Sequence, residues 1–173
     1  LTGIRTPTVG AVEIDGRDVR DWQLPALRQR VSLVRGQDIV QGTVLENVAL
    51  GRPGIGRGDV QNALESLGLL TDIMNLPDGL DTQLMVGGRP LSSSQRSRLI
   101  LSRAIVDRPR LLLLDQNLEN LESRTFADLA DFVFDRSSPW TLIVASRDEE
   151  VLKRCDRTID MASFGPIRTG MTG

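Results

Sequence analysis

The sequence predicts an α/β fold in which a sheet core carries an inserted helical lobe. Two observations indicate this class. Apolar strands alternate with helices in the C-terminal half, as in layered α/β domains, and the middle of the chain is mainly helical. At 173 residues and 19.0 kDa, with 40% apolar and 25% charged residues, the chain is typical of one folded domain of ordinary size.

The first elements follow from short apolar patterns. Val12 and Ile14 alternate with polar neighbours ahead of a tight turn, which is typical of a strand. Residues 24–30 are expected to form a short helix that runs into an apolar strand over 31–34. Gly42-Thr43 then opens another short helix.

The middle of the chain shows helical periodicity. The apolar positions at i, i+3, i+4 and i+7 are Val60, Ala63, Leu64 and Leu67. Ser92 can then cap a helix that reaches about Val106. We therefore place a helical lobe at about residues 43–108 and assign the remainder to the sheet core.

The C-terminal half begins with a near-continuous apolar strand over residues 110–115, as expected for a strand covered on both faces. Ser123 can cap the next helix. The remaining predicted elements are a strand at 141–145, a short helix around 151–154 and a last strand near Thr158–Met161.

Composition excludes several classes of function. The net charge is −2 and the sequence has no dense basic run, so we expect no nucleic-acid partner. No apolar stretch approaches the roughly 18 residues of a membrane span. The chain has no histidine, its one cysteine is Cys155, and its one lysine, Lys153, follows no glycine-rich loop.

Two stretches carry candidate chemistry. Ser92, Ser93, Ser94 and Gln95 lead into a helix, where free N–H groups and the helix dipole favour an anion, although such a start can equally be a cap alone. Asp115 ends the apolar strand and could hold Mg²⁺ or be merely its polar end. Ser92 lies 18 positions before Arg110, which leaves room for one helix and a turn between the two stretches.

Several segments in this order resemble the nucleotide-binding domain of exporter-type ABC transporters. "PTVGAVEIDGRDVRDW" is similar to the early strand pair, "GTVLENVALGRP" to the segment after the glutamine loop, and "LPDGLDTQL" to the lead-in to the signature. "LSSSQRSRLILSRAIVDRPRLLLLDQ" resembles the signature helix and Walker B strand, and "PWTLIVASRDEEVLKRCDRTIDM" the switch region. The resemblance spans nearly the whole chain and implies a P-loop NTPase-like core.

The resemblance also implies partners and cofactors. Domains of this family pair head to tail and hold ATP with Mg²⁺ between the phosphate loop of one copy and the signature of the other. The chain would then act beside a second ABC domain and transmembrane subunits at the cytoplasmic face of a membrane. The resemblance places its start just after the phosphate loop, so we expect the N-terminal part of the domain to be missing.

Several family positions carry altered residues. Ser93 and Ser94 stand where the signature has glycines, and Gln116 stands where the family has the glutamate that polarises the attacking water. Arg147 replaces the switch histidine, and Glu122 replaces an aspartate after Walker B. The glutamine loop is one residue short: Gln37 is its candidate, while Gly36 is the better-aligned position.

Three hypotheses follow. The first is a degenerate ATP-binding domain that contributes signature and Walker B elements, with slow or absent hydrolysis. The second is a non-catalytic interaction module that pairs with an active domain without nucleotide. The third is an active ATPase whose phosphate loop lies upstream of Leu1. If a central strand is missing, the strand at 111–115 is expected to lose a neighbour, and the chain to be marginally stable or to self-associate.

Overall fold

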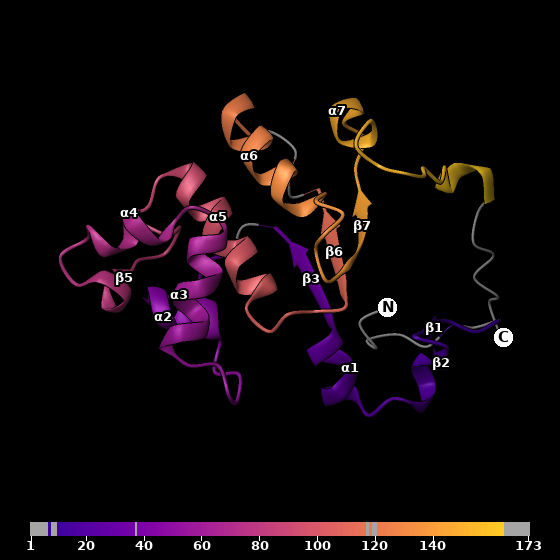
Figure 1. The fold of residues 1–173 in the computed structure, drawn as a ribbon, viewed down its shortest axis with the longest axis horizontal. Helices are drawn as coiled ribbons and strands as arrows, with labels where there is room; N and C mark the ends of the chain where they lie inside the picture. Colours follow the sequence, from indigo (N-terminus) through magenta and orange to yellow (C-terminus); the bar gives the residue numbers. More distant parts are fainter. Residues whose placement is uncertain (1–6, 8–9, 37, 117, 119–120, 165–173) are drawn as a thin grey trace, which may run out of the picture.

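A three-stranded parallel sheet forms the centre of the protein. In the computed structural model, which describes residues 7, 10–36, 38–116, 118 and 121–164, its strands are β3 (Val31–Arg35), β6 (Leu111–Asp115) and β7 (Thr141–Ala145). They pair in the order β3-β6-β7 (Figure 1). The predicted α/β class is therefore confirmed.

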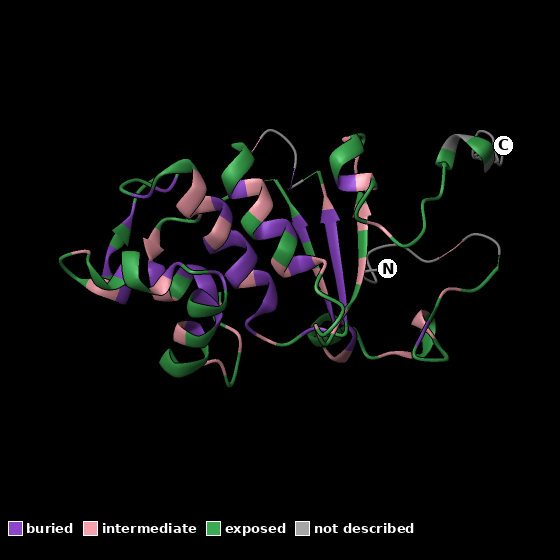
Figure 2. Cartoon of the chain, turned by 45° about the horizontal axis from the view of Figure 1, so that its top comes forward, coloured by how far each residue is buried: buried purple, intermediate pink, exposed green. Residues whose placement is uncertain are grey.

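β6 is buried on both faces, as its run of leucines predicts. Leu112 and Leu114 join the main apolar cluster on one face, whereas Leu111 and Leu113 join a smaller cluster with Leu27 on the other. In Figure 2 the strand is buried along nearly its whole length between its two neighbours. Both of its edges are paired, so the expectation that this strand loses a neighbour is wrong.

The smaller cluster covers only part of its sheet face. Leu33, Leu113 and Ile143 stand side by side in the strand register. Leu113 is buried, but Leu33 is 44% exposed and Ile143 is 46% exposed. Parallel sheets are usually covered on both faces, so this face is unusually open on either side of β6.

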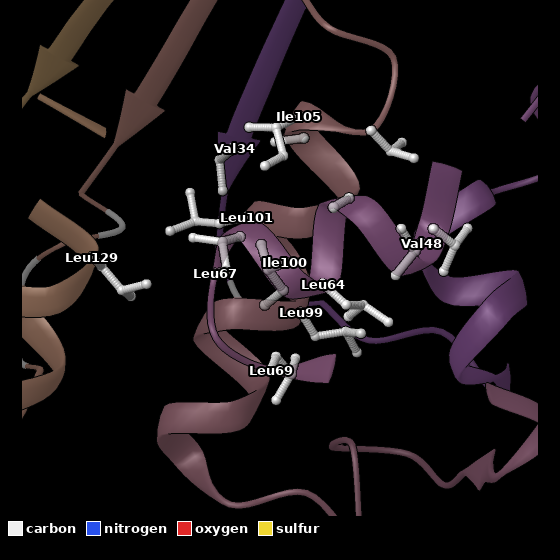
Figure 3. Close-up of a cluster of buried hydrophobic side chains, with 14 of the residues drawn as sticks. Val34, Val48, Leu64, Leu67, Leu69, Leu99, Ile100, Leu101, Ile105 and Leu129 are labelled. Carbon is white, nitrogen blue, oxygen red and sulfur yellow. The ribbon is translucent and has the colours of Figure 1, made fainter. Parts of the chain in front are cut away.

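Helices α2 (Val44–Ala49), α3 (Arg57–Ser66), α4 (Leu70–Met74) and α5 (Ser93–Ile105) gather on one side of the sheet (Figure 1). Their apolar faces form most of the main cluster, including Leu64, Leu99 and Ile100 (Figure 3). The periodicity predicted from Val60 onward is thus the buried face of α3. The short strands β4 (Gly42–Thr43) and β5 (Gln83–Leu84) pair beside these helices.

The remaining elements lie around this core. They are β1 (Glu13–Ile14), β2 (Arg17–Asp18), α1 (Leu24–Arg30), α6 (Ser123–Val133), α7 (Glu149–Leu152) and three 3-10 turns, η1 (Val19–Asp21), η2 (Gly79–Asp81) and η3 (Met161–Phe164). The predicted helix at 24–30 is confirmed. Ser123 is the first residue of α6 rather than its cap, which is Glu122.

The predicted last strand near Thr158–Met161 is wrong. Residues 158–160 form no helix or strand, and Met161 begins η3. Ile159 is 51% exposed and Met161 is 74% exposed, so neither apolar side chain belongs to the buried core. A strand needs a partner, and β7 pairs within the described sheet only with β6.

Candidate functional site

Asp115 lies at the carboxyl end of β6, where ligands of parallel α/β sheets gather. Its side chain is 39% exposed, so it is neither buried in the core nor fully solvated. Arg35 stands directly opposite it at the end of β3, and Arg35 Nε lies 3.3 Å from Asp115 Oδ2. The acid was predicted from the sequence, but the arginine beside it was not. The pairing of β3 with β6 cannot be inferred from either segment alone.

Gln116 continues this edge in an unusual conformation. Its φ of 58° is in the left-handed region, which few residues other than glycine adopt. Its backbone N–H donates to the carbonyl of Ala145 on β7, at 3.0 Å, and its side chain is exposed. The turn therefore presents the amide side chain to solvent immediately after Asp115.

Arg147 belongs to the same edge. Ala145 is the register partner of Asp115, and Arg147 follows it by two residues with an exposed side chain. Asp148 begins α7, and its carboxylate accepts a hydrogen bond from Glu150 N–H at 2.9 Å. The structure thus brings Asp115, Gln116 and Arg147 to one edge of the sheet. The candidate Gln37 lies outside the described residues.

The serine triplet opens α5 through a reciprocal cap. Ser92 Oγ accepts from Gln95 N–H at 3.2 Å, and Gln95 Oε1 accepts from Ser92 N–H at 2.9 Å. Gln95 Nε2 also donates to Asp72 Oδ2 at 3.0 Å. These two side chains are therefore occupied in holding the helix start, whereas the exposed Ser93 hydroxyl has no hydrogen-bond partner within the described residues.

α6 packs against this helix start. Thr125 Oγ1 donates to Ser94 Oγ at 3.0 Å, and Arg98 forms an ion pair of 2.7 Å with Asp128. Glu122, the N-cap residue of α6, lies one turn before Thr125. The serine triplet is thus held against α6, the helix that Glu122 precedes.

A cavity of about 260 Å³ lies beside β3 on the side away from β6. Arg103 on α5 crosses this region and donates to the carbonyl of Asp38 at 2.8 Å, to the carbonyl of Asn47 at 2.7 Å and to the side chain of Asn47 at 3.0 Å. Burial lowers the pKa of the Arg103 and Arg52 guanidinium groups that line the cavity. This cluster was not predicted from the sequence, because its local signal is limited to an asparagine in a short helix whose other residues are apolar except for Glu46.

The sequence profile of the ABC transporter family matches residues 1–119. The chain belongs to the ABC transporter family. Its structure is similar to that of a bacterial Atm1-family ABC exporter with ATP bound, with a TM-score of 0.73 and 28% identity over 85% of this chain and 26% of that one. It is an ATP-binding domain of the exporter type.

Curated relatives lead to the same family. The chain is 36% identical to a putative multidrug export ATP-binding/permease protein of Staphylococcus aureus over 94% of its own length and 28% of the relative. It is 32% identical to the uncharacterised ABC transporter ATP-binding protein YwjA of Bacillus subtilis over 90% of its length and 27% of the relative. This ABC domain thus spans about a quarter of these relatives. Within its described part, every helix is too short or too polar to cross a bilayer.

ABC domains generally bind ATP with Mg²⁺, so the fit of the sheet edge to this ion matters. Across the described residues, no three acidic or cysteine side chains gather where they could hold a metal ion. Arg35 already faces the Asp115 carboxylate. A divalent ion placed about 4 Å from a guanidinium would be repelled by about 2 kcal/mol even in bulk water. This edge of the ABC domain therefore does not fit Mg²⁺.

Proposed function

We propose that this chain is a degenerate ATP-binding domain of an ABC exporter, which contributes its signature helix to ATP held by a second ABC domain. In this arrangement the start of α5, from Ser92 to Gln95, faces the phosphates of the partner's nucleotide. The edge with Asp115 and Gln116 contributes little hydrolysis. The chain then supports or regulates transport rather than driving it alone.

The observation that carries this proposal is the exposed start of α5. This 13-residue helix begins with the exposed Ser92 and Ser93, and the Ser93 hydroxyl is not used in the cap. Backbone N–H groups at a helix start and the positive end of the dipole favour a phosphate. Ser94 is held by Thr125, so the helix start keeps a fixed position against α6.

Slow turnover is expected from the chemistry of Gln116. A carboxylate can accept a proton from attacking water, and an amide of the same shape cannot. Arg147 can contact a phosphate by charge, but it does not offer the geometry of an imidazole. The first substitution removes a proton acceptor, and the second keeps a positive charge for a phosphate.

The partners proposed are a second ABC domain and transmembrane subunits or domains at the cytoplasmic face of a membrane. The S. aureus relative supports this assembly, because its name describes an ATP-binding/permease protein and this chain matches only 28% of it. We assign residues 43–108 to the helical lobe. The cavity beside β3, between that lobe and the sheet, is a candidate contact for the transmembrane partner.

The test is to mix this chain with an intact exporter-type ABC domain that has its own phosphate loop, and to measure binding of a fluorescent ATP analogue. The chain is expected to raise the partner's affinity roughly fivefold or more, as for ordinary coupling between sites. Ser93→Glu places a negative charge at the helix start and is expected to remove the gain. Ser66→Glu, at an exposed serine on α3, is the matched control and is expected to keep it.

A second candidate function is a non-catalytic interaction module. It is favoured by the use of Ser92 and Gln95 within the cap and by Asp72, whose carboxylate lies beside Gln95 and disfavours an anion. The same experiment separates the two. If the chain binds the partner domain and the partner's ATP affinity does not change, the ATP-binding proposal fails and the interaction module stands.

A further inference from the structure

The sheet edge carries charges of the wrong sign for a metal site. Arg35 ends β3, Asp115 ends β6, and Arg147 follows β7, so two arginines flank one aspartate in three neighbouring segments. Gln116 adds an uncharged amide where a second carboxylate would only balance the two arginines. Mg²⁺ is usually held by one or two carboxylates together with substrate phosphates, and here the Asp115 carboxylate is already paired with Arg35.

The backbone fixes the position of Arg35. β3 and β6 are parallel neighbours, and the register places Arg35 directly opposite Asp115, so both side chains leave the same face of the sheet. The 3.3 Å approach of Nε to Oδ2 follows from that register. The side chain of Arg35 is 78% exposed, so it can reorient toward a ligand without leaving the carboxylate's neighbourhood.

The other carboxylates near this edge do not complete a metal site. Asp148 is used as the N-cap of α7. Asp38 lies in the segment after β3 and lines the cavity with Arg103. Among the described residues these groups form no cluster that could hold a metal ion.

We propose that Arg35 takes the place of a divalent cation at Asp115, so that this edge binds phosphate groups through arginine and without metal. Asp115 then orients Arg35 through the ion pair instead of binding Mg²⁺, and Arg147 supplies a second cation from the neighbouring segment. A guanidinium suits this role because it is permanently charged and donates in a planar fork to phosphate oxygens. The ligand class is a polyphosphate. This inference deepens the proposed function, since the phosphates would be those of a nucleotide.

The first experiment uses Mn²⁺ as the probe and the backbone amide signals of the whole chain in solution as the readout. The paramagnetic ion broadens amides near its binding position. In the natural chain we expect no selective broadening of Gln116 and Ala145. In Arg35→Ser we expect selective broadening of both, with apparent Mn²⁺ affinity raised roughly tenfold.

Two control variants separate charge from structure. Arg35→Lys keeps the positive charge and is expected to exclude Mn²⁺ like the natural chain. Arg28→Ser removes an exposed arginine on α1, which makes no ion pair in the described structure, and is expected to change nothing. If the natural chain and Arg35→Ser respond alike, whether both bind Mn²⁺ or neither does, Arg35 does not substitute for the ion and the proposal is overturned.

The second experiment measures binding of inorganic tripolyphosphate with EDTA present and again with excess Mg²⁺. The natural chain is expected to bind tripolyphosphate in EDTA and to bind it no more tightly with excess Mg²⁺, which itself complexes the anion. Arg35→Ser is expected to bind roughly tenfold more weakly in EDTA. Binding that appears only with Mg²⁺, or no binding in either condition, contradicts the proposal. Neither experiment involves Ser93 or a partner domain, so this inference and the proposed function can fail separately.

Discussion

Replacing Asn47 by alanine tests how the helices beside the sheet are held. Asn47 is fully buried on α2, and its side chain makes four hydrogen bonds of 2.9–3.0 Å. They join the N–H and carbonyl of Val40, the carbonyl of Thr43 and the guanidinium of Arg103. One side chain therefore ties α2 to the segment before it and to α5.

The expected loss follows from these bonds. Each is worth about 1 kcal/mol net, so Asn47→Ala is expected to lower the free energy of unfolding by about 4 kcal/mol. Alanine makes none of these bonds and leaves the partly buried guanidinium of Arg103 with one acceptor fewer. Typical domains have about 5 to 15 kcal/mol of stability, so the variant would lie near the limit of folding.

The measurement is urea unfolding followed by far-UV circular dichroism, with the slope against urea compared between variants. Asn62→Ala is the matched control, because Asn62 lies on α3 with an exposed side chain and the change there is expected to stay within about 0.5 kcal/mol. A loss for Asn47→Ala below about 1 kcal/mol at an unchanged slope would refute this account of how α2 is held.

Three further outcomes are expected. Leu112→Ala, at a fully buried position of β6, is expected to lower the free energy of unfolding by about 3 kcal/mol in the same urea assay. Leu33→Ala, at a 44% exposed position, should lower it by under about 1 kcal/mol. Equal losses would contradict the burial of β6. Thr125→Val removes the hydroxyl that donates to Ser94 and is expected to lower the free energy of unfolding by about 1 kcal/mol. Thermal unfolding should then show a lower melting temperature. An unchanged melting temperature would mean that this bond does not hold α6. Burial raises the pKa of the Cys155 thiol, so the thiol stays protonated to higher pH in the folded chain than in the unfolded chain. At mildly alkaline pH, thiol labelling of the folded chain should therefore be slower than labelling of the chain unfolded in urea. Equal labelling rates would contradict this shift.

The sequence predicted those elements whose signal is local. Four consecutive leucines sufficed for β6, and Ser92 followed by Gln95 sufficed for the start of α5, because burial and capping act within one segment. The strand over 141–145 was likewise confirmed. These patterns depend only on residues that are adjacent in the sequence, so they can be recognised without knowing the fold.

The sequence could not predict pairings between distant segments. The contact of Arg35 with Asp115 depends on the register of β3 with β6, across 80 positions of the chain. The bond of Thr125 to Ser94 depends on how α6 packs against α5. The strand expected near Thr158 failed for the same reason, because its apolar pattern does not supply the neighbour that a strand requires.

The position of β7 at the border of the described sheet has a consequence for motion. β6 has a neighbour on each side, so its amide protons should exchange with deuterium only when the whole domain unfolds, while the outward amides of β7 should exchange much faster. β3 is the other border strand, but β7 is the more exposed of the two, so the sheet would open from the β7 side. Arg147, which follows β7 by two residues, would then move away from this edge before Arg35 and Asp115 separate.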